Sequence, residues 1–479
     1  MKRIMISAMS SGSGKTTVTC ALLRALSKRG LQMEGFKCGP DYIDPMFQRR
    51  VLGIPCRNLD IFLQGEEGVL RTLAGQKGEV AVLEGAMGLF DGINGTEKDS
   101  AYHVATLTDT PIILVIKPSG VGLTLAAQVK GMQEFRKPNL IAGIILNDCK
   151  ESLFHYLKDL LERECHIPVL GYLPKIQEAA FESRHLGLVT ADEISDFDQR
   201  MDALAEALEM GCDLTELLKL CREGRVCDDE DIESKSVQKS EENKFSVEVH
   251  LKKEEVFLDN SQELSQSGER RLNEAQCRIA IARDEAFCFY YEENIEALIN
   301  AGAEIICFSP LRDKEVPEAE GLYLGGGYPE LYIKELSENV SMMESIRKCH
   351  DKGMPILAEC GGFLSIQKTL GGEKMAGILL GEGFKTDRLQ RFGFVTLMAE
   401  KDSLLFKAGE KIPAHEFHYW DSTDNGSDLY AEKLNGRNWK CAFCTENMYA
   451  GFPHLHFGGE LPLAERFVQA AVKYKKGKI

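Results

Sequence analysis

The sequence predicts an α/β protein with two domains that are joined by a long polar segment. Short apolar stretches alternate with amphipathic helical stretches in both halves of the chain, which is typical of parallel sheets covered by helices. A glycine-rich loop follows the first apolar stretch, and a charged segment with few large apolar residues separates the halves. A chain of 479 residues is long enough for two or three domains, each with its own core.

The first domain is predicted to span residues 1–195 and to contain a doubly wound parallel sheet, because helical stretches fall between its strand candidates. The strand candidates are Arg3–Ala8, Met33–Lys37, Val80–Glu84, Ile112–Ile116, Ile141–Asn147 and Val169–Leu173, and the helices between them include Thr16–Arg29 and Gly122–Phe135.

Residues 196–276 are predicted to form a helical and acidic linker, and residues 277–479 a second α/β domain. The stretch 224–275 is rich in Glu, Asp, Lys, Ser, Gln and Asn, so we expect it to stay solvated. The second domain has strand candidates at Arg278–Arg283, Ala303–Phe308, Gly321–Leu324 and Pro355–Ala358, and a predicted helix at Tyr291–Ala301.

The composition excludes several classes of protein. The formal net charge of −17 disfavours non-specific binding to nucleic acid or to an anionic membrane. No run of about 18 apolar residues predicts a membrane-spanning helix, and the first apolar stretch is too short for a signal peptide. The 15 cysteines do not form a zinc-binding pattern, and we expect them to be reduced thiols in a cytoplasmic protein.

The loop after the first strand has the features of a phosphate-binding loop. It reads Ser10-Ser11-Gly12-Ser13-Gly14-Lys15-Thr16-Thr17 and leads into a helix. Its glycines let backbone N–H groups face phosphate oxygens, while Lys15 adds a full charge and the Thr16 hydroxyl is placed to hold Mg²⁺. Met9 stands where the full Walker pattern has its first glycine, but the remainder predicts nucleotide binding.

Acidic residues follow two other strands of the same predicted sheet. Asp41 and Asp44 come after the second strand, and Glu84 and Asp91 lie at the end of a later one. The carboxyl ends of parallel strands meet at one edge of a sheet, so we expect these side chains near the phosphate loop. Thr16, Asp41 and Glu84 are the predicted Mg²⁺ ligands, and Lys37 is placed to stabilise a transferred phosphoryl group.

The second domain contains a predicted cysteine nucleophile. In Ala358-Glu359-Cys360-Gly361-Gly362, an apolar strand leads through Cys360 into a helix, and a sharp turn there would expose the thiol. The helix N-terminus is expected to favour the thiolate. Two histidines near the end of the chain, His454 and His456, are candidates for the base, and we favour His454. The loop after Gly321–Leu324 offers the N–H groups of Gly326 and Gly327 as an oxyanion hole.

Several of these segments together resemble the cobyrinic acid a,c-diamide synthase family, over nearly the whole chain except the acidic linker. The segments that carry the resemblance are Lys37–Pro45, Glu84–Gly92, Ser183–Leu188, Ala282–Tyr291, Gly325–Glu330, Met354–Leu364, His415–Tyr419 and Phe452–Phe457. The N-terminal domain also resembles dethiobiotin synthetase, in which an asparagine after the strand reads the nucleobase, and Asn147 matches that place. The resemblance implies a class I glutamine amidotransferase-like fold for the C-terminal domain.

The family implies a specific reaction for this chain. ATP with Mg²⁺ phosphorylates an acetate side chain of cobyrinate, a corrin macrocycle, and Cys360 releases ammonia from L-glutamine. Ammonia then converts the acyl phosphate to an amide, and the cycle acts on the a and c acetates in cobalamin biosynthesis. The usual glutamate two residues after the base is replaced by His456, so the resemblance implies a dyad of Cys360 and His454.

The residues implied for each role are as follows. The residues implied to bind ATP are Ser11, Gly12, Ser13, Gly14, Lys15, Thr16, Thr17, Lys37 and Asn147. Those implied to bind the acceptor substrate are Tyr42, Asp44, Asp91 and Arg184. Arg388 and Arg391 are further candidate cations for the carboxylates of the macrocycle.

Two kinds of alternative stay open at this point. The same chemistry could act on hydrogenobyrinate or nickel-sirohydrochlorin, and less readily on a cobyric acid precursor. A different class is an ATPase switch of the MinD type with an inactive amidotransferase domain, but Ser10 stands where such switches carry an extra lysine. A homodimer is left open.

Overall fold

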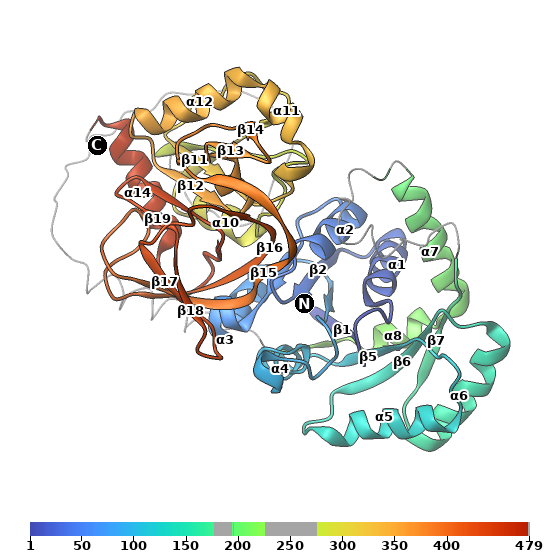
Figure 1. Ribbon diagram of the computed structural model, residues 1–479. Helices are drawn as coiled ribbons and strands as arrows, with labels where there is room; N and C mark the ends of the chain where they lie inside the picture. Colours follow the sequence, from blue (N-terminus) through green and yellow to red (C-terminus); the bar gives the residue numbers. More distant parts are fainter. Residues whose placement is uncertain (177–193, 195, 226–274, 478–479) are drawn as a thin grey trace, which may run out of the picture.

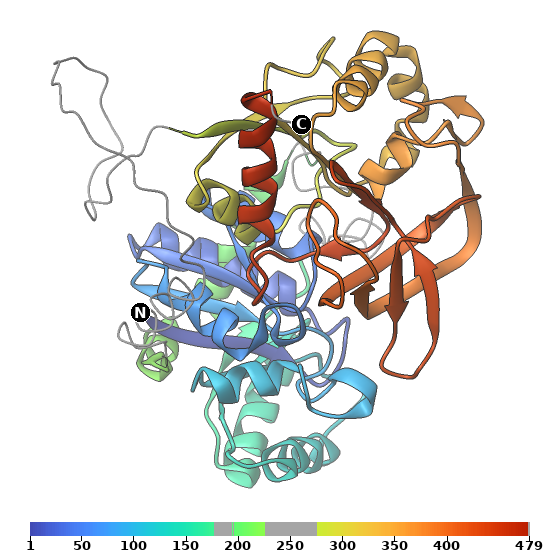
Figure 2. The ribbon, with the colours of Figure 1, turned by 90° about the vertical axis from the view of Figure 1, so that its left-hand side faces the viewer.

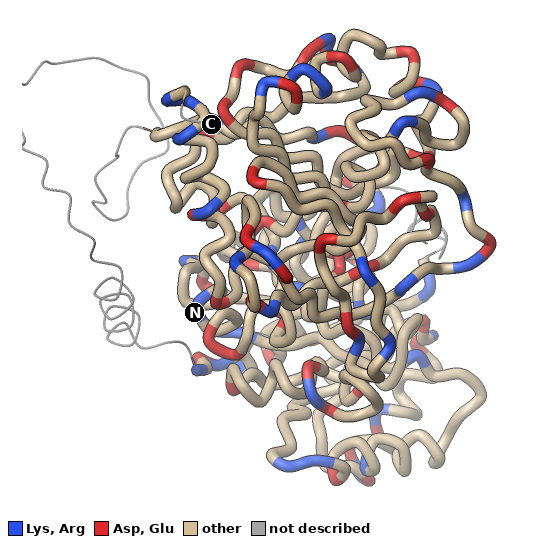
Figure 3. Tube along the Cα trace, turned by 60° about the vertical axis from the view of Figure 1, so that its left-hand side comes forward, with Lys and Arg blue, Asp and Glu red and all other residues tan. Residues whose placement is uncertain are grey.

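The computed structural model describes residues 1–176, 194, 196–225 and 275–477. It has an α/β architecture, as predicted, with an N-terminal domain built on a parallel sheet and a C-terminal α/β domain (Figure 1). Turned by 90°, the two domains are seen one above the other and in contact (Figure 2). Basic and acidic residues are interspersed over both domains, so lysines and arginines are present locally despite the negative net charge (Figure 3).

The N-terminal sheet has the strand order β3-β2-β4-β1-β5-β6-β7, and neighbouring strands in this order are parallel. The strands are β1 (Lys2–Ala8), β2 (Met33–Cys38), β3 (Arg57–Leu59), β4 (Val80–Glu84), β5 (Ile112–Ile116), β6 (Ile141–Asn147) and β7 (Val169–Leu173). All the strands that we predicted here are present, and the short β3 is an addition. The carboxyl ends therefore share one edge, where the phosphate loop and the acidic segments begin.

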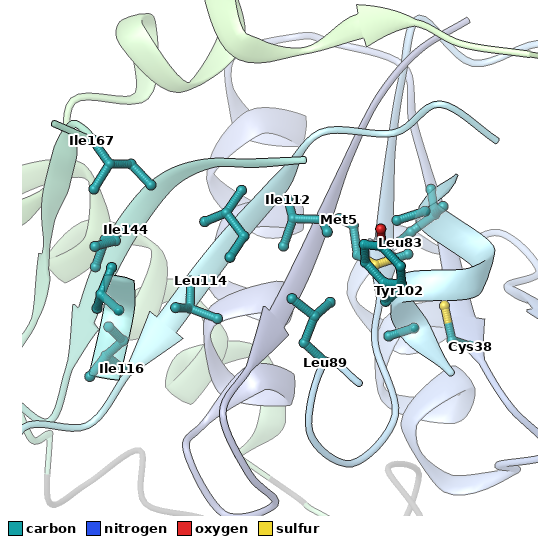
Figure 4. Packing of buried hydrophobic residues seen from close by; sticks show 14 of the residues in the cluster. Met5, Cys38, Leu83, Leu89, Tyr102, Ile112, Leu114, Ile116, Ile144 and Ile167 are labelled. Atoms are coloured by element: carbon teal, nitrogen blue, oxygen red, sulfur yellow. The ribbon is translucent and has the colours of Figure 1, made fainter. Parts of the chain in front are cut away.

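Helices cover both faces of this sheet, as a doubly wound fold requires. One face packs against α1 (Lys15–Lys28), α2 (Ile43–Leu52), α7 (Phe197–Gly211) and α8 (Leu214–Leu220), and the other against α3 (Ile61–Ala74), α4 (Ala101–Leu107), α5 (Leu123–Phe135) and α6 (Glu151–Cys165). Successive residues of β1 point to opposite faces, so Ile4 and Ile6 enter the first core and Met5 the second. Figure 4 shows Met5 close to Leu83 and Ile112 in the second core.

The start of the predicted linker packs on the N-terminal domain. Helix α7 lies against α1 and buries Met201, Leu204 and Leu208 in the first core (Figure 1). A short strand, β8 (Arg222–Glu223), pairs antiparallel with the beginning of β1. The apolar residues of α7 recur at helical spacing, which explains why this helix joins the core. Residues 226–274, the acidic part of the predicted linker, lie outside the described residues.

The C-terminal domain is built on a sheet with the order β10-β9-β11-β12-β20-β19. These strands are β9 (Cys277–Ala282), β10 (Ala303–Phe308), β11 (Gly321–Leu324), β12 (Ile356–Glu359), β19 (Phe443–Cys444) and β20 (Met448–Gly451), of which β19 alone runs antiparallel to its neighbour within this sheet. One face packs against α10 (Glu292–Asn300) and α14 (Leu463–Lys475), and the other against α11 (Ile333–Glu338), α12 (Val340–Asp351) and α13 (Gly361–Ser365).

A second, mostly antiparallel sheet lies beside it and was not predicted. Its long strands β15 (Glu382–Ala399) and β16 (Lys411–Ser422) form a ribbon, joined by β13 (Thr369–Leu370), β14 (Glu373–Lys374), β17 (Leu429–Glu432), β18 (Asn438–Cys441) and β21 (His454–Leu455). The ribbon reaches the N-terminal domain, where Phe394 packs on Phe62 of α3 with ring centroids 4.7 Å apart. Within the described residues, no helix is long and apolar enough to span a membrane.

Candidate active site

The phosphate loop lies at the carboxyl edge of the N-terminal sheet, between β1 and α1. Gly12 and Gly14 have φ values of +78° and +91°, a left-handed conformation that favours glycine. Asn147, at the end of β6, donates a hydrogen bond from Nδ2 to the Ser13 carbonyl oxygen at 3.0 Å. A Cβ on Gly14 would lie 2.0 Å from that Nδ2, so Asn147 and the loop require a glycine at this position.

Lys15 is held over the same loop. Its Nζ donates to the carbonyl oxygens of Ser10 at 3.3 Å and Met87 at 2.6 Å. Burial and the nearby charge of Lys37 lower the pKa of Lys15. Met87 belongs to the segment after β4, which is anchored on β1 by a hydrogen bond from the Leu89 N–H to the Ala8 carbonyl oxygen. The predicted phosphate-binding residues and the Glu84–Gly92 segment therefore lie together.

The predicted acidic residues form a connected cluster around Lys37. Glu84 Oε1 accepts hydrogen bonds from Thr16 Oγ1 at 2.6 Å and from Lys37 Nζ at 3.0 Å. Lys37 Nζ also lies 2.5 Å from Asp44 Oδ2 and 4.0 Å from Asp41 Oδ2. Burial opposes the charge of Lys37, yet Asp44, Glu84 and Asp41 together raise its pKa well above the usual value. Burial, with the charge of Asp44, raises the pKa of Glu84 to about 7.

The residues predicted to hold Mg²⁺ suit a hard cation. Thr16, Asp41 and Glu84 offer only oxygen donors, and two of these oxygens are already within 2.6 Å of each other. Among the described residues, no group of three or more His, Cys, Asp or Glu side chains could hold a metal. Two carboxylates and one hydroxyl suit Mg²⁺, which in nucleotide sites takes its remaining ligands from phosphate oxygens and water.

The remaining residues predicted to bind the acceptor differ in their surroundings. Asp91 lies in the segment anchored on β1, and its Oδ2 accepts a hydrogen bond from the Gly88 N–H at 2.9 Å. Arg184 lies outside the described residues. Arg388 is exposed on the ribbon, whereas Arg391 is paired with Asp421 and lies 3.5 Å from Glu416 Oε2. Arg391 is therefore already engaged within the C-terminal domain.

Cys360 occupies a sharp turn between β12 and α13. Its φ and ψ are +49° and −101°, a strained conformation for a residue with a side chain. The turn is tight because α13 starts directly against β11: a Cβ on Gly362 would lie 2.0 Å from the Leu324 carbonyl oxygen. This is the strand-to-helix turn of a nucleophile elbow. The expected exposure of the thiol is wrong, however, because Cys360 is buried between β12 and α13.

The glycine loop after β11 lies beside this turn. The Gly326 carbonyl oxygen accepts hydrogen bonds from the N–H groups of Cys288 and Phe289, both at 3.0 Å. A Cβ on Gly361 would lie 3.1 Å from the backbone nitrogen of Gly327. The predicted oxyanion residues and Cys360 are thus neighbours.

The ionisation of the glutaminase-type residues differs from the sequence expectation. We expected the helix N-terminus to favour the Cys360 thiolate, but burial and the charge of Glu330 raise the pKa of the thiol well above its usual value. Burial lowers the pKa of His454 to about 3. Burial therefore favours the neutral form of both the Cys360 thiol and the His454 imidazole.

The surroundings of the two candidate histidines are different. His454, in β21, lies against the glycine loop, since a Cβ on Gly326 would be 2.5 Å from its Cε1 atom. His456 Nδ1 accepts a hydrogen bond from the Gly458 N–H at 3.0 Å, and its Nε2 lies 3.2 Å from Gln64 Nε2 of the N-terminal domain. These contacts favour His454 as the base and give His456 a place in the domain interface.

Tyr42 joins the two sites. It stands between Asp41 and Asp44 in sequence, and its ring packs across the domain interface on Phe289, Tyr291 and His454, with centroids 5.1, 4.5 and 5.1 Å apart. The phosphate-site acids and the candidate base of the C-terminal domain are therefore connected by a single side chain.

Comparisons with known proteins identify both domains. Residues 4–188 match the CobQ/CobB/MinD/ParA nucleotide binding domain, and residues 278–461 match the CobB/CobQ-like glutamine amidotransferase domain. Proteins named cobyrinate a,c-diamide synthase are similar over their full length: that of Clostridium tetani is 38% identical, with 98% of this chain and 100% of the relative covered. That of Clostridium acetobutylicum is 36% identical with the same coverage, and that of Thermoplasma volcanium is 35% identical, with 99% and 98% covered.

The chain belongs to the cobyrinate a,c-diamide synthase family. The predicted resemblance and fold class are thereby confirmed. A nucleotide-binding domain that uses ATP and a glutamine amidotransferase domain in one chain make it a carbon–nitrogen ligase, so the alternative of a switch with an inactive second domain is not retained.

Two residues of this family member's phosphate site were missed from the sequence. Gln48 Nε2 donates to Glu84 Oε2 at 2.8 Å, and Asn58 Nδ2 donates to the carbonyl oxygens of Gly39 and Asp41 at 2.9 and 2.7 Å. Gln48 stands one helical turn after Asp44 on α2, a spacing that could have indicated a shared face. Asn58 also donates its backbone N–H to Glu293 of the C-terminal domain at 2.6 Å, a contact that no sequence pattern reveals.

Proposed function

We propose that this chain catalyses ATP- and glutamine-dependent amidation of the a and c acetate carboxylates of cobyrinate, in cobalamin biosynthesis. The observation that carries the proposal is the contact of Tyr42 with His454, because it brings a carboxylate-activating site and an ammonia-producing site to one domain interface. The identity of the macrocyclic substrate is taken from the names of the full-length relatives. The need for ATP and for a reduced thiol supports a cytoplasmic location, and a homodimer stays a prediction.

The ATP half-reaction uses the cluster at the carboxyl edge of the N-terminal sheet. An acetate oxygen attacks the γ-phosphorus and the bond to the β-γ bridging oxygen breaks. The products are ADP and an acyl phosphate. Lys15 and the loop N–H groups stabilise the phosphates, and Lys37 is placed to balance charge on the transferred group. Mg²⁺, held by Thr16, Asp41 and Glu84, would neutralise phosphate charge.

The glutamine half-reaction uses Cys360 and His454. His454 takes the thiol proton, the thiolate attacks the amide carbon of glutamine, and the N–H groups of Gly326 and Gly327 stabilise the oxyanion. The proton passes to the leaving nitrogen, ammonia departs, and water hydrolyses the thioester to glutamate. Ammonia then attacks the acyl phosphate carbon, phosphate leaves, and an amide is formed. The position of His454 against Gly326, in the loop beside Cys360, supports this role.

A panel of acceptors tests the proposed substrate. The purified chain is supplied with ATP, Mg²⁺ and glutamine together with cobyrinate, hydrogenobyrinate, nickel-sirohydrochlorin or a cobyric acid precursor, and mass spectrometry counts the amides formed. We expect two amides on cobyrinate and the highest kcat/KM for it. A higher kcat/KM for another macrocycle would move the assignment to that acceptor, and glutamine hydrolysis without amide formation on any of them would refute the ligase.

Replacing Tyr42 tests whether the two sites work through their shared interface. We expect Tyr42→Ala to raise the ratio of glutamate produced to amide formed severalfold, because the ring that closes the junction between His454 and the Asp41–Asp44 segment is lost. Tyr42→Phe keeps the ring contacts and should keep the ratio near that of the wild type. The two products are measured in the same reaction. An unchanged ratio in Tyr42→Ala would separate Tyr42 from ammonia transfer.

A further inference from the structure

The two ring nitrogens of His454 have different environments. A Cβ on Gly326 would lie 3.4 Å from Nε2, so the edge of the ring that carries Nε2 faces the glycine loop beside Cys360. Nδ1 is buried and has no hydrogen-bond partner among the described residues. If Nε2 is to accept the thiol proton, the neutral ring must carry its own hydrogen on Nδ1, and a buried N–H without an acceptor is unfavourable. The ring therefore needs an acceptor on its Nδ1 side.

Glu359 is placed to meet this need. Its Oε2 atom lies 3.9 Å from His454 Nδ1, and both side chains are 2% exposed. The carboxylate is fixed at two points: Oε1 accepts a hydrogen bond from the Leu455 N–H at 2.9 Å, and Oε2 accepts one from the Tyr323 hydroxyl at 2.8 Å. A separation of 3.9 Å is longer than a hydrogen bond, but such contacts in free enzymes often shorten when substrate is bound.

Other polar groups near His454 are already engaged or cannot carry the charge. Glu416 Oε2 lies 3.2 Å from His418 Nε2 and 3.5 Å from Arg391. Glu416 Oε1 is buried without a hydrogen-bond partner, but among the described residues the carboxylate within 4.0 Å of a His454 ring nitrogen is that of Glu359. His415, which is paired with His454 across β16 and β21, is buried, and burial lowers its pKa to about 4, so it is neutral. Glu359 is thus the carboxylate that the described residues present to His454 Nδ1.

We propose that Glu359 is a positioning residue for His454, and that it replaces the glutamate that related amidotransferases carry two residues after the base. During the reaction the proton of the Cys360 thiol moves to His454 Nε2, and the Glu359 carboxylate stabilises the resulting imidazolium through Nδ1–H without taking the proton itself. The inference rests on the glutaminase half-reaction proposed above. It turns the dyad expected from the sequence into a triad in which the acid directly precedes the nucleophile.

The variant Glu359→Gln tests the proposal, because an amide keeps the shape and the acceptor for Leu455 but loses the charge. We expect kcat for glutamine-dependent synthesis to fall about 10²–10⁴-fold, the range that proton-transfer catalysis contributes. The KM for glutamine should change by less than a few-fold, and synthesis with free ammonia should stay at the wild-type rate. The ammonia rate also reports whether the variant is folded.

Two further variants distinguish the effect of the Glu359 charge on kcat from the effect of its packing. Tyr323→Phe removes one hydrogen bond from Glu359 and keeps its charge, so it should lower kcat by only a few-fold. Glu359→Asp keeps the charge at shorter reach, so it should retain more glutamine-dependent activity than Glu359→Gln. A glutamine-dependent kcat of Glu359→Gln within about threefold of wild type would overturn the proposal, as would equal losses with glutamine and ammonia, or less activity in Glu359→Asp than in Glu359→Gln.

The variant Cys360→Ala, measured in parallel, distinguishes this failure from failure of the proposed function. If Cys360→Ala loses glutamine-dependent synthesis and Glu359→Gln does not, only the role of Glu359 is wrong. If Cys360→Ala keeps it, the glutaminase assignment itself is wrong.

Discussion

Replacing Cys360 with alanine is expected to abolish glutamine-dependent amidation, with a loss of about 10³-fold or more, and to leave ammonia-dependent amidation close to the wild-type rate. The reason is the geometry of the turn at Cys360. Its strained backbone, with φ of +49°, presents the thiol beside the glycine loop, and alanine keeps the turn but has no nucleophile. The measurement is the rate of amide formation by mass spectrometry, with glutamine or an ammonium salt as the nitrogen source.

The matched control is Cys307→Ala. Cys307 is exposed on β10, away from the elbow at the end of β12, so its loss should change neither rate. Loss of both rates in Cys360→Ala, in a protein that remains folded, would contradict the division of labour between the domains. Retention of the glutamine-dependent rate would show that another group attacks glutamine.

The parallel strands of both domains could be predicted closely from the sequence. The observed bounds of β4, β5, β6 and β7 are those predicted, because a strand covered on both faces is a continuous apolar run with polar residues at its ends. The glycine-rich loop between β1 and α1 was equally clear, since Gly12 and Gly14 have positive φ values. These features depend on residues that are close together in sequence, so a short sequence pattern is enough to predict them.

The ribbon of β15 and β16 could not be predicted, because no local sequence pattern marks its strands. Its outer half carries Lys385, Arg388 and other charged residues, and its pairing shifts register between Lys385 and Gly393. Neither a simple alternation nor an apolar run marks such a strand. What defines it is contact with residues distant in sequence, such as Phe62 on α3.

The candidate site likewise contains residues that the sequence indicates and contacts that only the folded chain creates. Asp41, Asp44 and Glu84 could be found one at a time at strand ends, but their common partner Lys37 and the ties to Gln48 and Asn58 exist only in the folded chain. Glu359 was overlooked because known patterns place the acid after the histidine. Here the glutamate beside the nucleophile reaches His454 only because β12 and β21 are brought together by the fold.

Replacing Lys15 with alanine is expected to stop synthesis with both nitrogen sources, by about 10²–10³-fold, and to leave basal glutamine hydrolysis intact. Lys15 is 7% exposed, and its ammonium is held between the Ser10 and Met87 carbonyl oxygens beside the phosphate loop. Its loss removes charge stabilisation of the phosphates but touches neither Cys360 nor His454. The measurements are amide formation with glutamine and with ammonia, and glutamate release without ATP.

This outcome differs from that of Cys360→Ala in the ammonia-dependent reaction, which Lys15→Ala should lose and Cys360→Ala should keep. The matched control is Lys130→Ala, since Lys130 is an exposed lysine on α5 of the same domain. Unchanged synthesis in Lys15→Ala would remove the phosphate loop from the reaction. Loss of glutamine hydrolysis as well, in a folded protein, would instead show that the nucleotide site controls the glutaminase site. Tyr42 would then be the contact to test first, because its ring links the Asp41–Asp44 segment to His454.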